Sequence, residues 1–375
     1  MFYSKLMKEI GSIKQDTTIA LINMSNIDGP RATYDIGGTT FRRAIVDPAG
    51  VVPESIEIIK KLHQIATNPQ LLANVFADNI IPAVQQGQKI FVISIAGPIQ
   101  TEIYGQYVSS PAGRIVEKFT NIFDDRNIHF ADMIEIIVKN KTGVDIEIIC
   151  INDGPAGTFA EMGKGGALIN AEEGVAFGIG TGLAGHYAKR VNGILTTTDI
   201  IREPGHTQMI FNRGSVNCGC GTTTGCIEPW ICGPGSVRTA QYLADTIQEF
   251  ETDSLGNYGV IIGSLTPEII SDAVNRNIPS AKVILKEMTW PMAALLRTLW
   301  VNHSEMRVVF NGGFALSLGD NYLQAVIQHL QGMGNAPFAT GNGADYLAMS
   351  TLNPNDINLL GSREYLRQVE ISRLP

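Results

Sequence analysis

The sequence predicts an α/β protein, and three observations support that prediction. Short apolar segments that read as strands alternate with segments in which apolar residues have helical spacing. Several predicted strands run directly into Gly-rich loops, where a backbone can turn sharply or approach a ligand. The chain has 375 residues, of which 44% are hydrophobic and 17% charged. That size and composition are typical of a globular protein with a large core and about two or three domains.

The predicted elements of the first 150 residues begin with two strands around a Gly-rich loop. A strand over Ala32–Ile36 ends at Gly37-Gly38, and a return strand over Phe41–Val46 ends at the turn of residues 47–50. The other elements predicted in this part are helices over 3–11, Pro69–Gln86 and Phe130–Lys141, and buried strands over Lys89–Ile95 and Ile146–Ile151.

The alternation continues in the rest of the chain. A Gly- and Ala-rich helix begins at Asp153 and reaches Glu161. Ser280–Val301 reads as a long helix, which Pro291 should bend. The remaining predicted elements are strands over Val175–Ile179 and Arg307–Phe310, the second ending in Asn311-Gly312-Gly313, and a helix over about 321–331.

Charge and composition exclude several classes of protein. The net charge of −8 argues against a general nucleic-acid binder, which usually carries a basic patch. No apolar run approaches the roughly 20 residues of a membrane span, and residues 1–30 lack the apolar core of a signal peptide. The count of five Cys is odd, which disfavours a disulfide framework. We therefore expect a cytoplasmic protein with no nucleic-acid partner and no membrane partner.

The most distinctive segment is Glu203–Glu228, which reads EPGHTQMIFNRGSVNCGCGTTTGCIE. It contains one His, three Cys and two Glu among Gly residues, and thiolates with one imidazole are the ligands that a structural Zn²⁺ prefers. The three Cys lie among Gly, Thr and Asn, which favours a metal site. The alternative is a set of buried unpaired thiols, a description that fits Cys150 and Cys232 better.

Two Gly-Thr segments share one plan. YDIGGTTFRRAIVDPAG and FGIGTGLAGHYAKRVNG each read as a strand, a Gly-Thr loop, a second segment and a turn. Two domains on this plan, facing each other across a cleft, would suit a phosphorylated ligand, because backbone N–H groups in tight Gly turns cradle phosphate oxygens. The alternative is two ordinary hairpins, and these residues leave both open.

A dinucleotide fingerprint is also present, because Gly180, Gly182 and Gly185 satisfy G-x-G-x-x-G. A helix should follow such a fingerprint at once, whereas the turn at Asn192-Gly193 favours a hairpin arm. No Gly-Lys-Ser/Thr follows a Gly-rich run, which also disfavours a nucleotide P-loop.

In combination, these motifs resemble the ROK family of bacterial sugar kinases and repressors, which belongs to the hexokinase and actin-like superfamily. The segments that carry the resemblance occur in family order between about residues 33 and 350. They are DIGGTTFRRAIVD at 35–47 for the first phosphate loop, INDGPAGTFAE at 151–161 for the catalytic segment, FGIGTGLAG at 177–185 for the second phosphate loop, EPGH at 203–206 and CGCGTTTGCIE at 218–228 for the sugar and zinc motifs, VVFNGG at 308–313 for the adenosine-binding strand and loop, and GNGADYLA at 341–348 for the closing helix.

The resemblance implies two RNase-H-like domains of the actin-like ATPase fold with an interdomain cleft. The small domain would comprise residues 1–150, completed by a C-terminal helix at about 341–375. The large domain, with the zinc-tied loop, would comprise residues 151–340. The implied ligands are ATP, Mg²⁺, a sugar and a structural Zn²⁺. Relatives commonly form homodimers or homotetramers, so we expect a homo-oligomer.

The resemblance also implies a role for each site residue. Asp153 is the candidate general base, because phosphoryl transfer to an alcohol needs a group that accepts the hydroxyl proton. An Asp at the start of a helix can alternatively be its cap. The other implied assignments are sugar hydroxyls to Asn152, Glu203, His206 and Glu228, water-mediated Mg²⁺ to Asp35, phosphates to Gly37, Gly38, Thr39, Gly180, Thr181 and Gly182, adenosine to Gly312 and Gly313, and zinc to His206, Cys218, Cys220 and Cys226.

Structural roles are the alternatives for several of these residues. They are a surface carboxylate for Glu203, a charge at a helix N-terminus for Glu228, a packed imidazole for His206, and tight turns for the Gly residues. The chain also departs from the family pattern, because the Thr run 222–224 lengthens the Cys spacing by one residue. Pro111 is followed by Ala112 where the family commonly has Asn, and extra material lies at about 1–30, 245–280 and 353–375.

The expected function is that of an ATP-dependent kinase, which phosphorylates a glucose-like hexose at its 6-hydroxyl. The alternatives are an N-acylhexosamine kinase and a sugar-sensing regulator with weak catalysis. Family repressors carry an N-terminal helix-turn-helix domain, and about 30 residues before the first phosphate loop are too few for one. An α/β protein with only a structural zinc is the third possibility.

Overall fold

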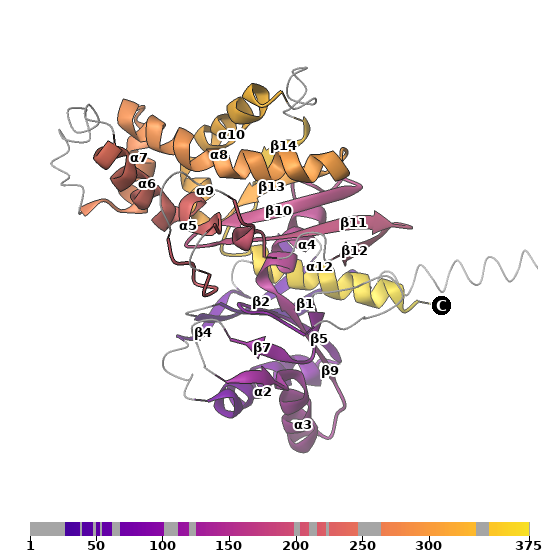
Figure 1. The fold of residues 1–375 in the computed structure, drawn as a ribbon. Helices are drawn as coiled ribbons and strands as arrows, with labels where there is room; N and C mark the ends of the chain where they lie inside the picture. The colour runs from indigo at the N-terminus through magenta and orange to yellow at the C-terminus, as the bar shows by residue number, and fades with distance from the viewer. Residues whose placement is uncertain are drawn as a thin grey trace, which may run out of the picture. The chain divides into compact units, whose positions relative to one another are not determined.

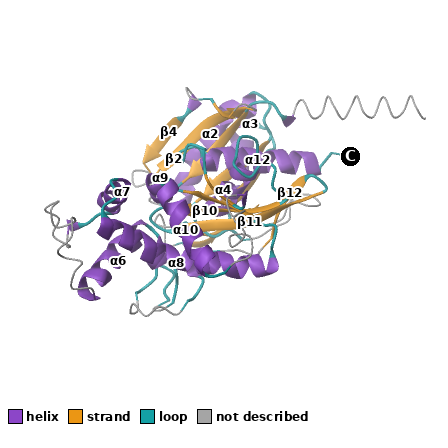
Figure 2. Ribbon diagram, turned by 90° about the horizontal axis from the view of Figure 1, so that it is seen from above, coloured by secondary structure: helices purple, strands orange, loops and turns teal. Residues whose placement is uncertain are grey.

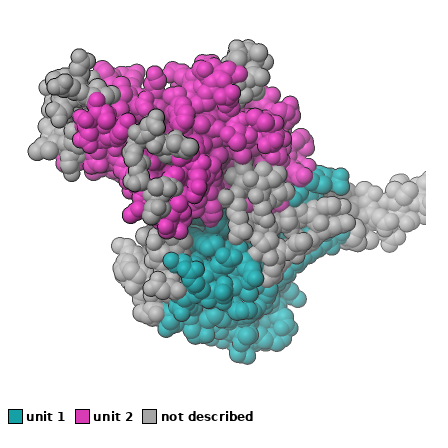
Figure 3. Space-filling model, in the orientation of Figure 1, with its two compact units in different colours: residues 1–159, 191–196, 358–375 teal, residues 160–190, 197–357 magenta. Residues whose placement is uncertain are grey.

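The computed structural model describes residues 27–37, 40–47, 50–52, 55–61, 68–100, 112–119, 125–198, 203–209, 216–222, 225–246, 264–334 and 345–374. The chain divides into two compact units, which Figures 1 and 3 show and which are described separately. Unit 1 is Met1–Phe159, Val191–Thr196 and Asn358–Pro375, and unit 2 is Ala160–Arg190 and Thr197–Ile357. The helix predicted over 3–11, and the predicted site residues Gly38 and Thr39, lie outside the described residues.

The sheet of unit 1 contains the strands predicted for the first 150 residues. β1 (Arg31–Ile36) pairs antiparallel with β2 (Thr40–Asp47), which confirms the first hairpin. β5 (Ile90–Ile95) is parallel to both β1 and β9 (Glu147–Asn152). The sheet order is β3-β2-β1-β5-β9-β6, with β3 at Gly50–Val51, β6 at Ala112–Gly113 and β4 at Glu57–Lys61 paired to β2, while β7 (Val116–Lys118) and β8 (Arg126–Ile128) form a separate pair.

Two predicted helices pack on this sheet through buried aromatic side chains. α2 (Pro69–Gln85) begins after Asn68, whose side chain accepts a hydrogen bond from Leu71 N at 2.7 Å. α3 (Phe130–Thr142) ends at Gly143, where φ is 75°, a conformation that glycine adopts without strain. The fully buried rings that join these helices to the sheet include Tyr34, Phe41, Phe76, Phe91 and Phe130.

The C-terminal helix lies within the predicted range of about 341–375 but starts after the segment that resembles the closing helix. We expected a closing helix at 341–348, but β14 (Leu347–Met349) is a strand that pairs parallel with β13, so that prediction is wrong for its described part. Leu347 is buried, and Tyr346 O accepts a hydrogen bond from Val308 N, so these apolar residues are used to extend the sheet. The helix is α12 (Ile357–Ser372), and its Gly361 lies so close to α4 (Asp153–Met162) that a Cβ there would meet Ala156 O at 1.8 Å.

Unit 2 contains the strands β11, β10, β13 and β14 of the sheet β12-β11-β10-β13-β14; Figure 2 labels its β10 and β11. β10 (Glu173–Ile179) turns back antiparallel into β11 (Leu183–Val191), which is followed by β12 (Ile194–Thr198). The expected hairpin arm is therefore confirmed, and the G-x-G-x-x-G match has no helix after it and is not a dinucleotide site. β13 (Arg307–Asn311) is parallel to β10, as alternating strands and helices predict.

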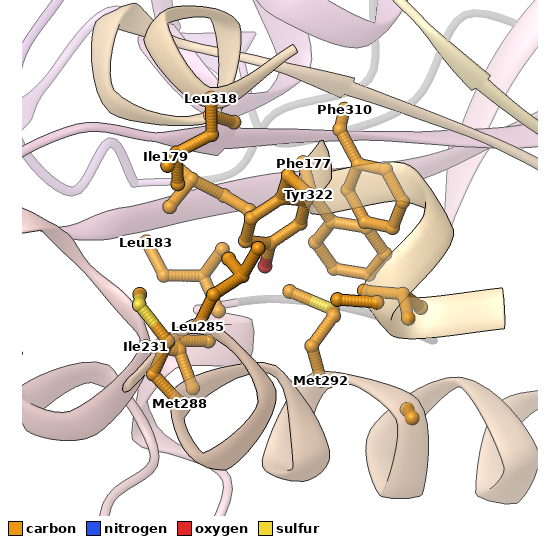
Figure 4. Packing of buried hydrophobic residues seen from close by; sticks show 14 of the residues in the cluster. Phe177, Ile179, Leu183, Ile231, Leu285, Met288, Met292, Phe310, Leu318 and Tyr322 are labelled. Atoms are coloured by element: carbon orange, nitrogen blue, oxygen red, sulfur yellow. The ribbon is translucent and has the colours of Figure 1, made fainter. Parts of the chain in front are cut away.

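Helices cover this sheet and bury a continuous apolar cluster. α8 (Pro279–Asn302) continues through Pro291; its Met292 points toward Tyr322, whereas its Met288 lies beside Ile231 (Figure 4). The rings of Phe310 and Tyr322 meet edge to face, with centroids 5.2 Å apart. The other helices of unit 2 are η3 (Pro204–His206), α5 (Glu228–Ile231), α6 (Gly233–Thr246), α7 (Pro267–Asn275), α9 (Gly313–Leu318) and α10 (Asp320–Gly332). Within the described part of the chain, no helix combines the length and apolar character needed to cross a membrane.

Candidate functional site

In unit 1, four predicted site residues gather at one edge of the sheet. The ends of the three parallel strands are aligned, because Ile36 pairs with Ile95 and Ile95 with Asn152. Asp35 lies near the end of β1 and Gly37 directly after it. Asn152 ends β9, and Asp153 is the first residue of α4. Ligands of open α/β sheets bind outside the carboxyl ends of the strands, so this edge is the candidate site of unit 1.

The side chain of Asn152 is hydrogen-bonded to the backbone at this edge of the sheet. Its Nδ2 donates to Gly97 O at 2.8 Å, and its Oδ1 accepts from Gly154 N at 3.0 Å. Asn152 thus satisfies an N–H of the first turn of α4, which the cap alternative had assigned to Asp153. Asp153 is half-buried at the helix N-terminus, where the helix dipole favours a negative charge. Asp153 therefore stays the candidate base at this edge of the sheet.

Asp35 is buried and hydrogen-bonded on both carboxylate oxygens, which the sequence did not predict. The side chain is 1% exposed, and Arg42 Nε donates to its Oδ2 at 3.0 Å. Asn358 Nδ2 donates to Oδ1, also at 3.0 Å. Mg²⁺ keeps a shell of oxygen ligands, several of them water, so a buried carboxylate with both oxygens already bonded is a poor fit for it. Arg42 was detectable in principle, because a hairpin around residues 37–40 places residue 35 opposite residue 42.

In unit 2, two Gly-rich loops lie side by side at the ends of β10 and β13. Gly178 pairs with Asn311, so the chain leaves both strands at the same level. Gly312 has a φ of 86°, and a Cβ there would lie 2.5 Å from Ile179 N. By contrast, a Cβ on Gly180 or on Gly313 would meet nothing within 4 Å. The predicted phosphate loop, Gly180 to Gly182, and the predicted adenosine loop are therefore neighbours, with open space beside Gly180 and Gly313.

The Glu-Pro-Gly-His motif packs against the second Gly-rich loop. Glu203 is exposed and has a φ of 51°, an uncommon left-handed conformation for a residue other than glycine. A Cβ on Gly205 would lie 3.0 Å from both Glu228 Oε2 and Leu183 O, so only glycine allows this approach. Glu228 Oε2 in turn accepts a hydrogen bond from Leu183 N at 2.9 Å. The carboxylate of Glu228 thus belongs to the same assembly as the loop, and Glu203 O accepts a hydrogen bond from His206 N at 3.0 Å within the motif.

The four predicted zinc ligands come together. One ligand atom from each of His206, Cys218, Cys220 and Cys226 lies within 4.8 Å of all the others. His206 Nδ1 is 3.4 Å from Cys218 Sγ, and Cys220 Sγ is 3.7 Å from Cys226 Sγ. A tetrahedral zinc with Zn–S near 2.3 Å places its sulfur atoms about 3.8 Å apart, so the donor set fits this metal.

The extra Thr of this loop takes part in its geometry. Cys218 N donates to Thr222 O at 2.9 Å, and Gly221, with a φ of 90°, provides the turn between them. The hydrogen bond with Thr222 lowers the pKa of the Cys220 thiol to about 7, whereas burial raises the pKa of Cys218 to about 12. A divalent metal needs thiolates, so its binding here would release protons.

Glu161 is a buried carboxylate that the sequence analysis missed. It lies in the last turn of α4, is fully buried, and accepts hydrogen bonds from Ala167 N at 3.2 Å and Asn311 Nδ2 at 3.5 Å. Burial raises the pKa of its carboxyl above the usual value. Because Asn311 precedes Gly312, Glu161 supports the base of the predicted adenosine loop.

Comparison with known proteins identifies the relatives of this chain. A sequence model described as the ROK family matches residues 31–342. The fold is similar to that of a ROK family glucokinase from Streptomyces griseus in complex with glucose and AMPPNP, with 22% identity over 89% of this chain and 98% of that chain and a TM-score of 0.60. It is also similar to a ROK hexokinase from Thermus thermophilus, with 17% identity, 90% and 97% coverage and a TM-score of 0.62.

A regulator is also among the similar structures. It is a ROK family transcriptional regulator, a homolog of the E. coli MLC protein, with 16% identity over 92% of this chain and 81% of that chain and a TM-score of 0.64. No curated protein sequence is significantly similar to the chain. At these identities the likeness concerns the fold, and it confirms the predicted two-domain actin-like ATPase architecture.

Proposed function

The chain belongs to the ROK family, and we propose that it is an ATP-dependent kinase that phosphorylates a glucose-like hexose at its 6-hydroxyl. The observation that carries this proposal is the placement of Asn152 and Asp153. They follow a buried parallel strand, and Asn152 takes the hydrogen-bonding role at the start of α4. A half-buried carboxylate at such a strand end is suited to accept a proton from an alcohol.

The acceptor sugar is proposed to bind to the carboxylates and the imidazole of unit 2. Glu203, His206 and Glu228 belong to one assembly around Gly205. Vicinal hydroxyls both donate and accept hydrogen bonds, so carboxylates bind them through two bonds and discriminate against analogues that lack one hydroxyl. His206 presents Nδ1 to Cys218, which leaves Nε2 as the ring nitrogen available to a sugar.

The phosphoryl donor is proposed to bind along the Gly-rich loops. Thr181 and Gly182 are proposed to offer backbone N–H groups to phosphate oxygens. Gly180, whose own N–H donates to Gly182 O at 3.0 Å, is proposed to shape this turn beside the phosphates. Gly312 and Gly313 are proposed to offer a flat surface to adenosine. Open space at Gly180 and Gly313 supports this assignment. Gly37, whose N–H donates to Thr40 O at 3.0 Å, is proposed to border the phosphate site of unit 1, together with Gly38 and Thr39.

In the proposed mechanism, Asp153 accepts the proton of the 6-hydroxyl while the oxygen of that hydroxyl attacks the γ-phosphorus of ATP. The bond between the γ-phosphorus and the bridging oxygen breaks, and ADP leaves with that electron pair. Zinc bound by His206, Cys218, Cys220 and Cys226 would have a structural role, holding the loop that carries the sugar-binding groups. We further propose that the protein is a homodimer or homotetramer, as is common among its relatives.

A second candidate function is that of a sugar-sensing regulator with weak catalysis. The observation that favours it is the full hydrogen-bonding of Asp35, because that carboxylate is the one expected to orient Mg²⁺. An N-acylhexosamine kinase is a variant of the first proposal with another acceptor.

The test is an ADP-release assay with Mg-ATP and glucose, mannose, fructose, allose, N-acetylglucosamine or N-acetylmannosamine. Asp153→Asn is compared with wild type, and Asp145→Asn, at a side chain 84% exposed, is the matched control. Turnover with one sugar that persists in the control and falls by about 10²-fold or more in Asp153→Asn supports the kinase and its base. Sugar binding without turnover in any protein supports the regulator, and full activity of Asp153→Asn refutes the base assignment.

A further inference from the structure

Asp35 and Arg42 form a buried pair across the first hairpin of unit 1. The two residues are register partners in the antiparallel ladder of β1 and β2. Asp35 is 1% exposed and Arg42 is 19% exposed, so the carboxylate is enclosed and the guanidinium largely so. The pair lies one residue from the end of β1, next to Gly37, at the edge where the predicted phosphate loop begins.

Both oxygens of Asp35 are occupied by donors from two separate elements. Arg42 binds Oδ2 through Nε, at 3.0 Å, and through Nη2. Asn358, near the start of α12, donates from Nδ2 to Oδ1 at 3.0 Å. A carboxylate has about four acceptor positions, so these three donors use most of them. The side-on contact of Arg42 is the two-bond geometry in which a guanidinium holds a carboxylate most firmly.

This arrangement conflicts with a role for Asp35 in orienting Mg²⁺. Mg²⁺ demands octahedral oxygen ligands and gives up its waters reluctantly, so a carboxylate that orients it must offer oxygens to water. Asp35 has almost no contact with solvent, and a cation that approached it would also be repelled by Arg42.

We propose that Arg42 is the permanent counter-ion of Asp35, and that Asp35, Arg42 and Asn358 form a clasp that joins β1, β2 and α12 and does not orient Mg²⁺. The clasp anchors the segment before the first Gly-rich loop to the C-terminal helix. Any Mg²⁺ that accompanies the nucleotide is then held by the phosphates and by groups other than Asp35. Only the statement about Mg²⁺ rests on the proposed function; the clasp itself rests on the contacts of Asp35.

Arg43 provides a matched control in the same strand. It contacts Glu57, whose side chain is 54% exposed, and its Nη1 donates to Asn79 O at 3.2 Å. The ion pair is therefore a surface pair, and its expected effect on stability is small. Arg42 and Arg43 are adjacent and chemically identical, and they differ in the burial of their acidic partner. A difference between their variants therefore reports on the clasp and not on the loss of one positive charge.

The first experiment is a double-mutant cycle measured by urea unfolding of the full chain. The variants are Asp35→Asn, Arg42→Gln, the double variant, and Arg43→Gln. Each clasp variant alone should lower the urea midpoint, because it leaves a buried group without its partner. The double variant should lose clearly less than the sum of the two, and Arg43→Gln should match wild type. Additive losses, or no loss in Asp35→Asn, would overturn the clasp.

The second experiment measures how Mg²⁺ changes ADP affinity, by calorimetry, in wild type, Asp35→Asn and the double variant. The clasp predicts the same Mg²⁺ enhancement in all three, within about twofold. A loss of tenfold or more in the enhancement with Asp35→Asn would assign the residue to the metal instead. If either single variant fails to fold, the double variant still carries this measurement. If wild type binds no ADP, the proposed kinase fails, while the unfolding cycle still decides the clasp.

Discussion

The backbone N–H of Leu183 donates a hydrogen bond of 2.9 Å to Oε2 of Glu228, whose Oε1 lies 3.8 Å from Cys218 Sγ. Leu183 is the first residue after the Gly180 to Gly182 loop, and Cys218 belongs to the candidate zinc cluster. One carboxylate therefore links the predicted phosphate loop to the predicted metal site. Glu228 is thus a support of the fold of unit 2 as well as a candidate ligand of the sugar.

These two roles of Glu228 can be separated by substitution. Glu228→Gln keeps an oxygen that can accept from Leu183 N, so we expect near-normal stability but weaker sugar binding, measured by calorimetry. Glu228→Ala leaves that N–H without its partner, and we expect an additional loss of about 1–3 kcal/mol in the free energy of unfolding. Equal sugar affinity in wild type and Glu228→Gln would limit Glu228 to the structural role.

Removal of one predicted zinc ligand should change metal content and stability together. Cys220→Ser removes one of the four donors, and we expect zinc to fall from about one equivalent per chain and the thermal midpoint to fall with it. Elemental analysis and thermal unfolding of the same samples measure the two quantities. Cys232→Ser is the control, because Cys232 is buried but lies outside the cluster. A metal-free wild type with an unchanged midpoint would contradict the zinc assignment.

The elements that the sequence predicted well are those whose pattern is local. Pro69–Gln85 and Pro279–Asn302 are long helices with a periodic apolar face, and Ile90–Ile95 is a continuous apolar run. β14 has only three residues, too few for any period to show, and the helix expected there rested on the family resemblance alone.

The site could be predicted from sequence only where its residues are close along the chain. The four predicted zinc ligands fall within a short Gly-rich segment, and their types alone indicate a metal. The contact of Asp35 with Asn358 joins residues 323 positions apart, and no local pattern encodes such a pair. Likewise, Glu161 and Asn311 are 150 positions apart and meet only because α4 ends beside β13.

Gly312 should be the glycine of the adenosine loop that tolerates substitution least. Its φ of 86° is unfavourable for alanine, and a Cβ would overlap the backbone of Ile179. We expect Gly312→Ala to lower the free energy of unfolding by about 1–3 kcal/mol or more, measured in urea. Gly313→Ala, where a Cβ meets nothing within 4 Å at the start of α9, should stay within about 1 kcal/mol of wild type. Similar losses in both variants would show that the loop is not constrained as described.

The buried carboxyl of Glu161 predicts a particular dependence of stability on pH. Burial raises its pKa above the ordinary value of 4.5, so between those two values the folded state holds a proton that the unfolded state has released. The free energy of unfolding then falls as pH rises through this interval, because its slope against pH follows the protons bound by the unfolded state minus those bound by the folded state.

The variant Glu161→Gln cannot ionise and should lose this part of the pH dependence. Its stability relative to wild type should therefore improve as the pH rises, which urea unfolding at a series of pH values measures. Glu305→Gln, at an exposed residue, is the control variant, and parallel profiles for wild type and Glu161→Gln would show that folding does not change the pKa of Glu161.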